Sequence, residues 1–431
     1  MPININGKLR IKGATTGGNG GGGGTEFISV WDTTLSKEPS IELPLVASGN
    51  YNFSVNWGDG NTDTITAWGQ LERAHTYATD GVYTVTITGT IEGWSGVRYL
   101  TQIIDIGCLK LGNEGAYFQS SEELTSIGGT FDLTGTTNLT GMFNGCTLLT
   151  SVNGISSWNT SAVTDMSYMF INATAFNQPL NSWNTAAVTD MYSMFQNTTA
   201  FNQDISGWDV SSVTDMNYMF ANATAFNQPL NSWNVSAVTD MTSMFSYSAF
   251  NQPLNSWDTS AVTNMPSMFE GTTAFNQDIS GWDVSSVTDM NYMFGDTTAF
   301  NQSLNSWNTS AVTNMNSMFV YATAFNQPLN SWNVSAVTDM TDIFFNATNF
   351  NQNISGWDVS NVQYMNRFMD GKSTADFSYY DDLLNAWSLL TLQNGVYWDM
   401  GSIEYTSAGA TARQDIIDNY SWNITDGGLA A

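Results

Sequence analysis

The stretch WDVSSVTDMNYMFANATAFNQPLN, residues 208–231, recurs with few changes along the middle of a 431-residue chain. A fixed period of this length is typical of a solenoid, in which each unit contacts mainly its neighbours and cannot bury its apolar face alone. The chain therefore presents a long, stacked surface. Its marker is a tryptophan that recurs every 25 residues, with one step of 24, at Trp158, Trp183, Trp208, Trp233, Trp257, Trp282, Trp307, Trp332 and Trp357.

Comparison of the repeats with one another separates an expected core from an expected surface. The positions that hardly change hold Trp208, Val213, Met216, Met219 and Phe220 in the quoted unit. Apolar residues at one position of every coil must stack into continuous columns through a solenoid. We interpret these columns as structural and not as cofactor or ligand sites.

Two segments of one unit carry different secondary-structure signals. Residues 201–208, FNQDISGW, are typical of a strand, and residues 214–220 of a short helical turn. Asp215 is the expected cap of that turn, because an Asp or Asn side chain accepts hydrogen bonds from backbone N–H groups. The Phe-Asn-Gln positions, residues 201–203, predict ladders of amide side chains that satisfy backbone groups.

The capping position forms a column of Asp and Asn along the solenoid. Carboxylates stacked about 5 Å apart repel one another unless they are capped, hydrogen-bonded or bridged by cations. A calcium ladder is the alternative to capping, and replacement of Asp by Asn favours capping. The column holds Asp165, Asp190, Asp215, Asp240, Asn264, Asp289, Asn314 and Asp339.

The chain is strongly acidic, with 10 Lys and Arg against 38 Asp and Glu. No basic residue lies between Lys110 and Arg367. Such a surface repels phosphate backbones, so no nucleic-acid partner is expected. The charge keeps the chain in solution or recruits cations or basic partners.

No apolar run approaches the ~18 residues of a membrane-spanning helix, and no ordinary cleaved signal is found, so neither membrane insertion nor export by such a signal is expected.

The residue types that most often carry catalysis or metal binding are scarce. Cys108 and Cys146 form neither a disulfide framework nor a CxxC pair. Cys146 falls in the column that Ala173, Ala223 and Ala322 fill later, which favours a packed residue. With His75 as the one histidine, a His-based catalytic triad or zinc site is hard to assemble. We predict no enzyme, no catalytic residue, no metal and no cofactor.

The N-terminus has the features of an attachment device. Residues 1–16 alternate apolar and polar residues and carry Lys8, Arg10 and Lys12. Residues 17–25 form a glycine-rich linker. We expect the segment 1–16 to bind other proteins of a virion, and a tail without a role is the alternative.

Residues 26–96 predict a small β-sandwich, with strands near 27–30, 41–45, 51–57 and 83–88. The stretches VNWGDG at 55–60 and HTYATDGVYTV at 75–85 resemble the polycystic kidney disease (PKD) domain. That resemblance implies an immunoglobulin-like spacer or adhesive module without chemistry of its own, and a structural role for His75.

Residues 97–370 resemble BspA-type leucine-rich repeats, on WDVSSVTDMNYMF at 208–220 and AFNQDISGW at 200–208. The resemblance implies a right-handed solenoid with one parallel strand per coil, used for adhesion or recognition. Residues 97–150 are degenerate coils, as expected at a solenoid end. The period ends near Met369, and residues 371–431 predict a cap with helices at 381–387 and 410–417 and a strand at 395–398.

The resulting expectation is a mainly β, non-enzymatic structural protein of a bacteriophage virion. It would be a capsid decoration, head fibre, spike or tail-fibre subunit that recognises a glycan or protein on the host surface. A monomer and a homo-oligomer both fit. The alternatives are a bacterial cell-surface adhesin, which would be extracellular, and an intracellular interaction scaffold.

A ligand face is expected at positions that vary between coils. Residues that change within a repeated frame have no part in the common core, so they are free to serve recognition. The candidates are Tyr168, Tyr192, Tyr218, Tyr247, Glu270, Tyr292, Asp296 and Tyr321.

Overall fold

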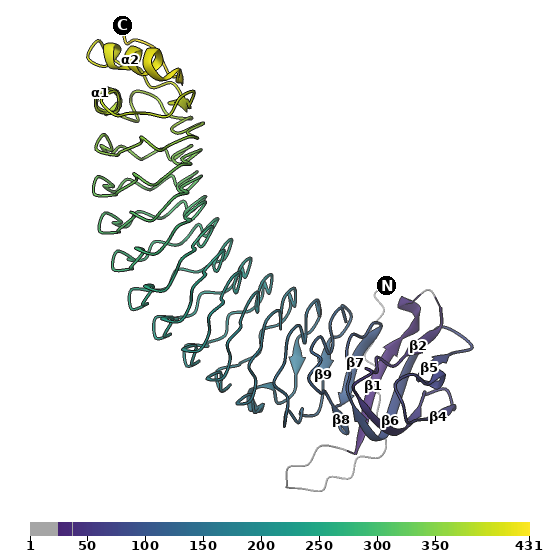
Figure 1. Cartoon of the computed structure of the whole chain (residues 1–431). Coiled ribbons are helices and arrows are strands. Elements are labelled where there is room, and N and C mark those ends of the chain that lie inside the picture. Colours follow the sequence, from purple (N-terminus) through teal and green to yellow (C-terminus); the bar gives the residue numbers. More distant parts are fainter. Residues whose placement is uncertain (1–24, 37) are drawn as a thin grey trace, which may run out of the picture.

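The computed structural model describes residues 25–36 and 38–431. A sheet-rich N-terminal part leads into a curved solenoid that ends in two helices (Figure 1). Segment 1–16, with Lys8, Arg10 and Lys12, lies outside the described residues, as does the glycine linker up to residue 24. Within the described residues, neither α-helix has the length and apolarity needed to cross a membrane.

The N-terminal strands form one large mixed sheet and a small second one. The large sheet has the order β10-β9-β7-β1-β6-β3-β4, with β8 beside β6, and the small sheet pairs β2 with β5. The strands are β1 (Glu26–Asp32), β2 (Ser40–Glu42), β3 (Asn50–Asn56), β4 (Thr62–Ile65), β5 (Ala74–Thr76), β6 (Val82–Glu92), β7 (Leu100–Asp105), β8 (Leu109–Lys110), β9 (Ser126–Ile127) and β10 (Ser151–Val152). Short 3-10 helices are η1 (Thr33–Leu35), η2 (Leu71–Arg73) and η3 (Ile155–Ser157).

Alternation of apolar and polar residues builds these strands, as the sequence predicts. In β3 the side chains of Tyr51, Phe53 and Val55 are buried while their neighbours are exposed. Phe27 and Trp31 of β1 pack on Trp94, with the rings of Phe27 and Trp94 edge-to-face at 5.2 Å. The four strands expected between residues 27 and 88 are present, although the second ends at Glu42.

The large sheet continues from the N-terminal part into the solenoid. One edge of β7 pairs antiparallel with β1, and its other edge pairs parallel with β9, which in turn pairs with β10. A single cluster of buried apolar residues accordingly runs from Phe27 to Trp422. The sheet thereby crosses the boundary expected at residue 96.

The expected strand at residues 201–208 is wrong for the regular coils. Strands at this edge occur in the first coils as β9 and β10, but residues 201–205 have no regular secondary structure. Instead, the backbone N–H of Asn202 donates to the side-chain oxygen of Asn177 in the preceding coil, at 3.1 Å. In the regular coils an amide side chain thus joins neighbouring coils, whereas β9 and β10 are joined by direct backbone pairing.

The expected helical turn at residues 214–220 is also wrong. Met219, Ala221 and Ala223 donate backbone hydrogen bonds to carbonyls three residues earlier. The N–H groups of Tyr218 and Phe220 instead donate to carbonyls of the next coil, at 2.9 Å each, so they cannot close helical turns. The segment is a chain of tight turns, and beside it Asp215 forms single parallel β-bridges with Asp190 and Asp240.

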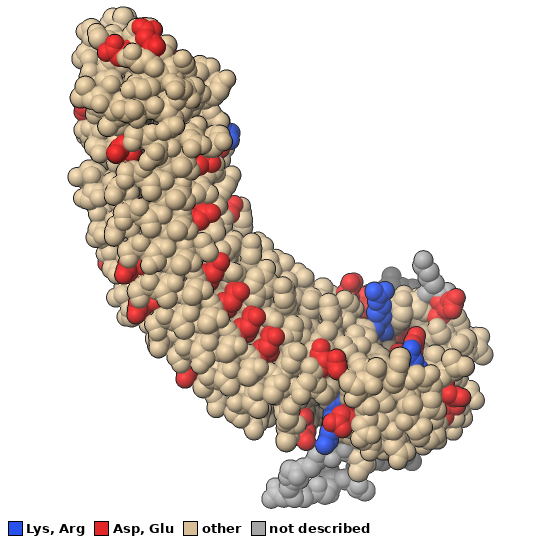
Figure 2. Space-filling view, viewed as in Figure 1, with Lys and Arg blue, Asp and Glu red and all other residues tan. Residues whose placement is uncertain are grey.

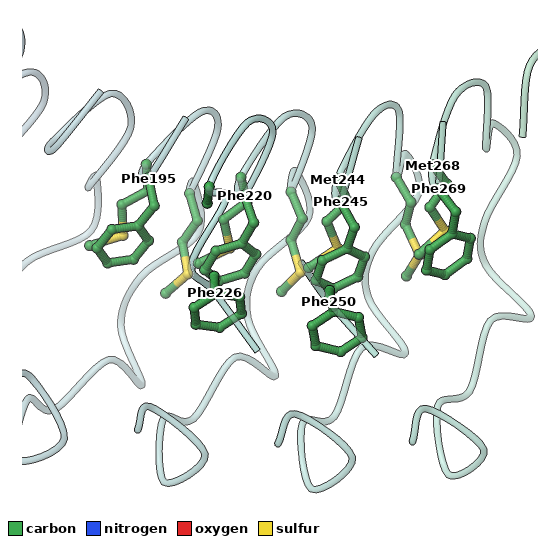
Figure 3. Close-up of a cluster of buried hydrophobic side chains, with 14 of the residues drawn as sticks. Phe195, Phe220, Phe226, Met244, Phe245, Phe250, Met268 and Phe269 are labelled. Atoms are coloured by element: carbon green, nitrogen blue, oxygen red, sulfur yellow. The ribbon is translucent and has the colours of Figure 1, made fainter. Parts of the chain in front are cut away.

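The apolar columns stack as the repeats predict. Phe220 lies 5.7 Å from Phe195 and 5.8 Å from Phe245, ring centre to ring centre, and 4.0 Å from Phe226 of its own coil. Figure 3 shows these rings and the methionines interleaved between coils. The tryptophans also stack, and the indole N–H of Trp208 donates to the carbonyl of Leu180 at 3.0 Å. Burial therefore leaves that polar group satisfied.

The solenoid bends toward its turn segments. Direct backbone hydrogen bonds between coils hold strands about 4.8 Å apart. On the far side of the core, Trp183 and Trp208 stack at 6.1 Å, and Trp208 and Trp233 at 6.5 Å. Because the coils are closer along the turns, we place the turns on the inside of the arc in Figure 1.

The C-terminal residues cover the last coil. They form α1 (Tyr380–Trp387), β11 (Tyr397–Asp399), α2 (Ala410–Tyr420) and β12 (Asn423–Thr425), close to the expected helices and strand. The N–H of Ser378 donates to the side-chain oxygen of Asn351, which continues the asparagine ladder. Lys372 is 2% exposed and donates from Nζ to the carbonyls of Thr348 and Phe350.

Candidate functional site: the inner turn face

The inner turns of successive coils form one surface, which we call the turn face. It consists of residues 166–172 and their equivalents in each later coil. Two residues per coil, four apart, have positive φ, and their side chains lie between buried neighbours such as Met169 and Phe170. The first such position holds Tyr168, Ser193, Tyr218, Ser243, Ser267, Tyr292, Ser317, Asp342 and Arg367, and the second holds Asn172, Asn197, Asn222, Tyr247, Gly271, Asp296, Tyr321, Asn346 and Gly371.

The structure places all eight predicted ligand-face residues on the turn face. Six of them occupy left-handed positions, and Tyr192 and Glu270 each precede one. Four of the tyrosines are well exposed, with fractions of 38% for Tyr168, 48% for Tyr247, 37% for Tyr292 and 41% for Tyr321. The turn face is thus a strip of half-exposed rings along the inside of the arc.

Three tyrosines cluster on the first regular coils. The ring centres of Tyr168 and Tyr192 are 5.0 Å apart, and those of Tyr192 and Tyr218 are 5.9 Å apart. Next to this cluster, residues of the earlier coils, including Gln119, Asn138 and Tyr168, line a groove of about 320 Å³. The cluster therefore offers aromatic contact area beside a polar groove.

The middle of the turn face combines a tyrosine with carboxylates. The hydroxyl of Tyr247 donates to Glu270 at 2.7 Å, and this bond, with burial, raises the pKa of Tyr247 to about 12. Burial and the charge of Glu270 raise the pKa of Asp296. A side chain at Gly271 would meet the Tyr247 ring, since an added Cβ would lie 2.3 Å from it. Gly271 therefore leaves room for the ring to lie flat.

Two residues that the sequence reasoning missed extend the strip. Tyr321 packs edge-to-face on Phe345 at 5.3 Å, and the guanidinium of Arg367 lies 4.7 Å from the Phe345 ring. Arg367 also pairs with Asp342. The 25-residue period contained the signal, because Phe345 shares the column of Glu270, and Arg367 that of Tyr292.

The column of Asp and Asn lies beside the turn face and is used for capping. Oδ1 of Asp215 accepts the N–H of Asn217 at 2.9 Å, and Asp165, Asp190 and Asp289 make the same bond within their coils. Capping is thereby confirmed, as an Asx turn and not at a helix start. Figure 2 shows acidic side chains in a row along the solenoid. In the described part of the chain, no group of three His, Cys, Asp or Glu is arranged to hold a metal ion.

The amide ladder is confirmed as well. The side-chain oxygen of Asn202 accepts the N–H of Asn227 at 3.0 Å, and Gln228 donates to the same oxygen at 2.9 Å. These bonds lie outside the turn face and join each coil to the preceding one. Asn and Gln of this column therefore hold the stack together.

The histidine and the cysteines lie away from the turn face. His75 stacks on Trp57 at 5.0 Å, and its Nε2 contacts Asp59 at 2.8 Å. A backbone bond from Asn61 and the contact with His75 lower the pKa of Asp59 to about 2.

Cys146 is fully buried and donates to the carbonyl of Phe118, which confirms a packed residue. Cys108 is partly buried and unpaired.

Together, the mainly β N-terminal sheet, the 25-residue aromatic period and the stacked turns define a solenoid repeat protein. The chain belongs to the protein family described as "Mycoplasma protein of unknown function, DUF285", which matches residues 115–230, 228–319 and 266–387. Among solved structures, a similar chain is that of the "Crystal structure of TLR13-ssRNA13 complex", with 9% identity over 78% of this chain and 73% of that one and a TM-score of 0.16. No curated protein matches the chain.

Proposed function

We propose that this protein is a non-enzymatic recognition protein whose turn face binds an extended ligand on a host surface. The observation that carries the proposal is the strip of half-exposed tyrosines over successive coils. Tyrosine supplies a rigid ring with a polar tip and loses little conformational entropy on binding. Most coils add one tyrosine to the turn face, so the strip suits a ligand that is itself extended.

A glycan suits this surface better than a peptide strand or a nucleic acid. The backbone N–H groups of the turns already donate to the neighbouring coil, so no free edge is offered for strand addition. The absence of Lys and Arg between Lys110 and Arg367 opposes binding of a phosphate backbone. Tyrosine rings and hydroxyls can contact both the C–H faces and the hydroxyls of sugars.

We further propose that the protein belongs to a bacteriophage virion, as a decoration, fibre or spike subunit, with a bacterial cell-surface adhesin as the alternative. The basic residues of segment 1–16 and the glycine linker support attachment to a particle. The PKD-like motifs around His75 and the BspA-type repeat pattern support a module used outside cells. Mass spectrometry of purified virions should detect the chain, and its recovery in cell envelopes alone would favour the adhesin.

Substitutions that the protein already uses elsewhere test the turn face. Tyr218→Ser and Tyr292→Ser install the residue that other coils carry at the first left-handed position, and Tyr247→Asn does so at the second. We expect the triple variant to fold normally and to bind host cells at least 10-fold more weakly, since each aromatic anchor contributes about 1 kcal/mol or more. The matched control replaces Pro179, Pro229 and Pro253 by Ser; these exposed residues directly follow the amide ladder and lie outside the turn face. Unchanged binding by the tyrosine variant would rule out the turn face.

A further inference from the structure

A second pocket lies where the N-terminal sheets meet the first coils. We call it the arginine pocket, because Arg73 and Arg98 line it together with Glu42, Gln119 and Ser120. Its volume is about 610 Å³, within the usual size of small-molecule sites. Most of the basic side chains visible in Figure 2 gather at this end of the arc.

The lining combines an apolar floor with convergent polar groups. Trp31, Leu43 and Val97 contribute buried apolar surface to the pocket. At its rim, Tyr99 and Ser120 have φ of 64° and 61°, left-handed values that are uncommon outside glycine. At Ser120 this conformation belongs to the series of left-handed positions that the later coils repeat. The pocket therefore combines apolar and polar groups, as small-molecule sites do.

The two arginines differ in what already holds them. Arg73 contacts Glu42 at 2.5 Å and lies over the ring of Trp68. Arg98 is exposed, and none of the four ion pairs formed by the described residues includes it. Among the residues that line this pocket, two guanidinium groups face one carboxylate. Arg98 is therefore the guanidinium of this pocket that is not held by a carboxylate, and it can donate to one anionic group of a ligand.

The arginine pocket is continuous with the turn face. Gln119 lines both this pocket and the groove that contains Tyr168. Ala116 and Ser120, with φ of 50° and 61°, continue the paired left-handed positions of the later coils back to the pocket. A ligand lying along the tyrosines can thus place its end beside Arg98.

We propose that the arginine pocket binds the carboxylate of an acidic sugar residue in a glycan whose neutral remainder lies along the turn face. This inference rests on the proposed recognition function. A carboxylate fits better than a phosphate or sulfate chain, because a single guanidinium without an ion pair is surrounded by an acidic molecule with a formal net charge of -28. Glu122 and Glu123 line an adjoining hollow together with Arg98, and their charges would repel a polyanion more strongly than a single carboxylate.

The test uses pairs of oligosaccharides that differ in one group, each acidic member being matched with its carboxyl-reduced form. The full chain, Arg98→Ala and Lys110→Ala are applied to an array of such pairs. Lys110 is the matched control, because it is an exposed cation of the same region that does not line the pocket. The full chain should prefer the acidic member by about 10- to 100-fold, the range of a charge-assisted hydrogen bond. Arg98→Ala should lose that preference, and Lys110→Ala should keep it.

The outcomes separate the two proposals. Equal binding of the acidic and reduced members by the full chain, or a preference that survives Arg98→Ala, overturns the arginine pocket and leaves glycan recognition by the turn face standing. If the full chain binds none of the oligosaccharides and its attachment to host cells is abolished by protease treatment of those cells, the ligand is a protein and both glycan proposals are wrong.

Discussion

Asn222 occupies a left-handed position with φ of 57° on the turn face. Asn tolerates this conformation, Gly adopts it freely, and a β-branched residue strains it. We expect Asn222→Gly to leave the free energy of unfolding almost unchanged and Asn222→Val to lower it by about 1–2 kcal/mol. Urea unfolding of the two variants checks this. Equal stability of Val and Gly at this position would mean that φ is not constrained there.

Most buried and surface positions could be assigned from the sequence, because comparison of the repeats separates the positions that stay constant from those that vary. Trp208 and Phe220 recur unchanged and prove to be buried, whereas Tyr292 alternates with Ser and proves to be exposed on the turn face. The left-handed backbone could not be predicted from the first position, which holds Tyr, Ser, Asp and Arg. The second position, mostly Asn, Asp and Gly, carried a usable signal.

The elements were harder to predict than the residues. A strand at residues 201–208 and a helical turn at 214–220 follow from local patterns, but hydrogen bonds between coils override both. The N–H of Tyr218 bonds to the next coil, and the N–H of Asn202 bonds to a side chain. In a solenoid these partners lie about one period away, where a short sequence window contains no information about them.

The cap depends on a buried lysine, and its stability should vary with pH. Burial lowers the pKa of Lys372 from 10.5 to about 8. Between pH 8 and 10.5 the unfolded chain therefore holds a proton that the folded chain has released, so this group makes stability rise with pH across that window. Across this pH window, the contribution of Lys372 to the free energy of unfolding should increase by about 2–3 kcal/mol.

The measurement compares the wild type with Lys372→Met, which keeps the volume but cannot titrate or donate to Thr348 and Phe350. Urea unfolding of both proteins at pH 7, 8, 9 and 10 isolates the contribution of the lysine. The free energy of unfolding of the wild type should rise relative to that of the variant as the pH increases above 8. A difference that stays constant over this range would show that Lys372 is not desolvated in the cap.

The whole molecule is a stack in which each coil contacts mainly the next, so its length should be adjustable. Deletion of residues 208–232, one full period, removes a coil and brings Gly207 directly to Trp233 with every column in register. We expect a folded protein with the circular dichroism spectrum of the wild type and a smaller radius in solution. Deletion of residues 208–220, about half a period, breaks the register of the columns and should abolish folding. A folded protein after this deletion would contradict the conclusion that the stacked apolar columns hold the coils together.

Ligand contact by the exposed tyrosines of the turn face is the claim on which the functional proposal depends, and tyrosine footprinting tests it most directly. Host envelopes are mixed with the protein, exposed tyrosines are nitrated, and the extent of modification is measured by mass spectrometry. We predict protection of Tyr168, Tyr247, Tyr292 and Tyr321, while Tyr397, a cap residue that is 61% exposed, is nitrated as in the free protein. Equal nitration of the four turn-face tyrosines with and without envelopes that bind the protein would contradict recognition by this surface.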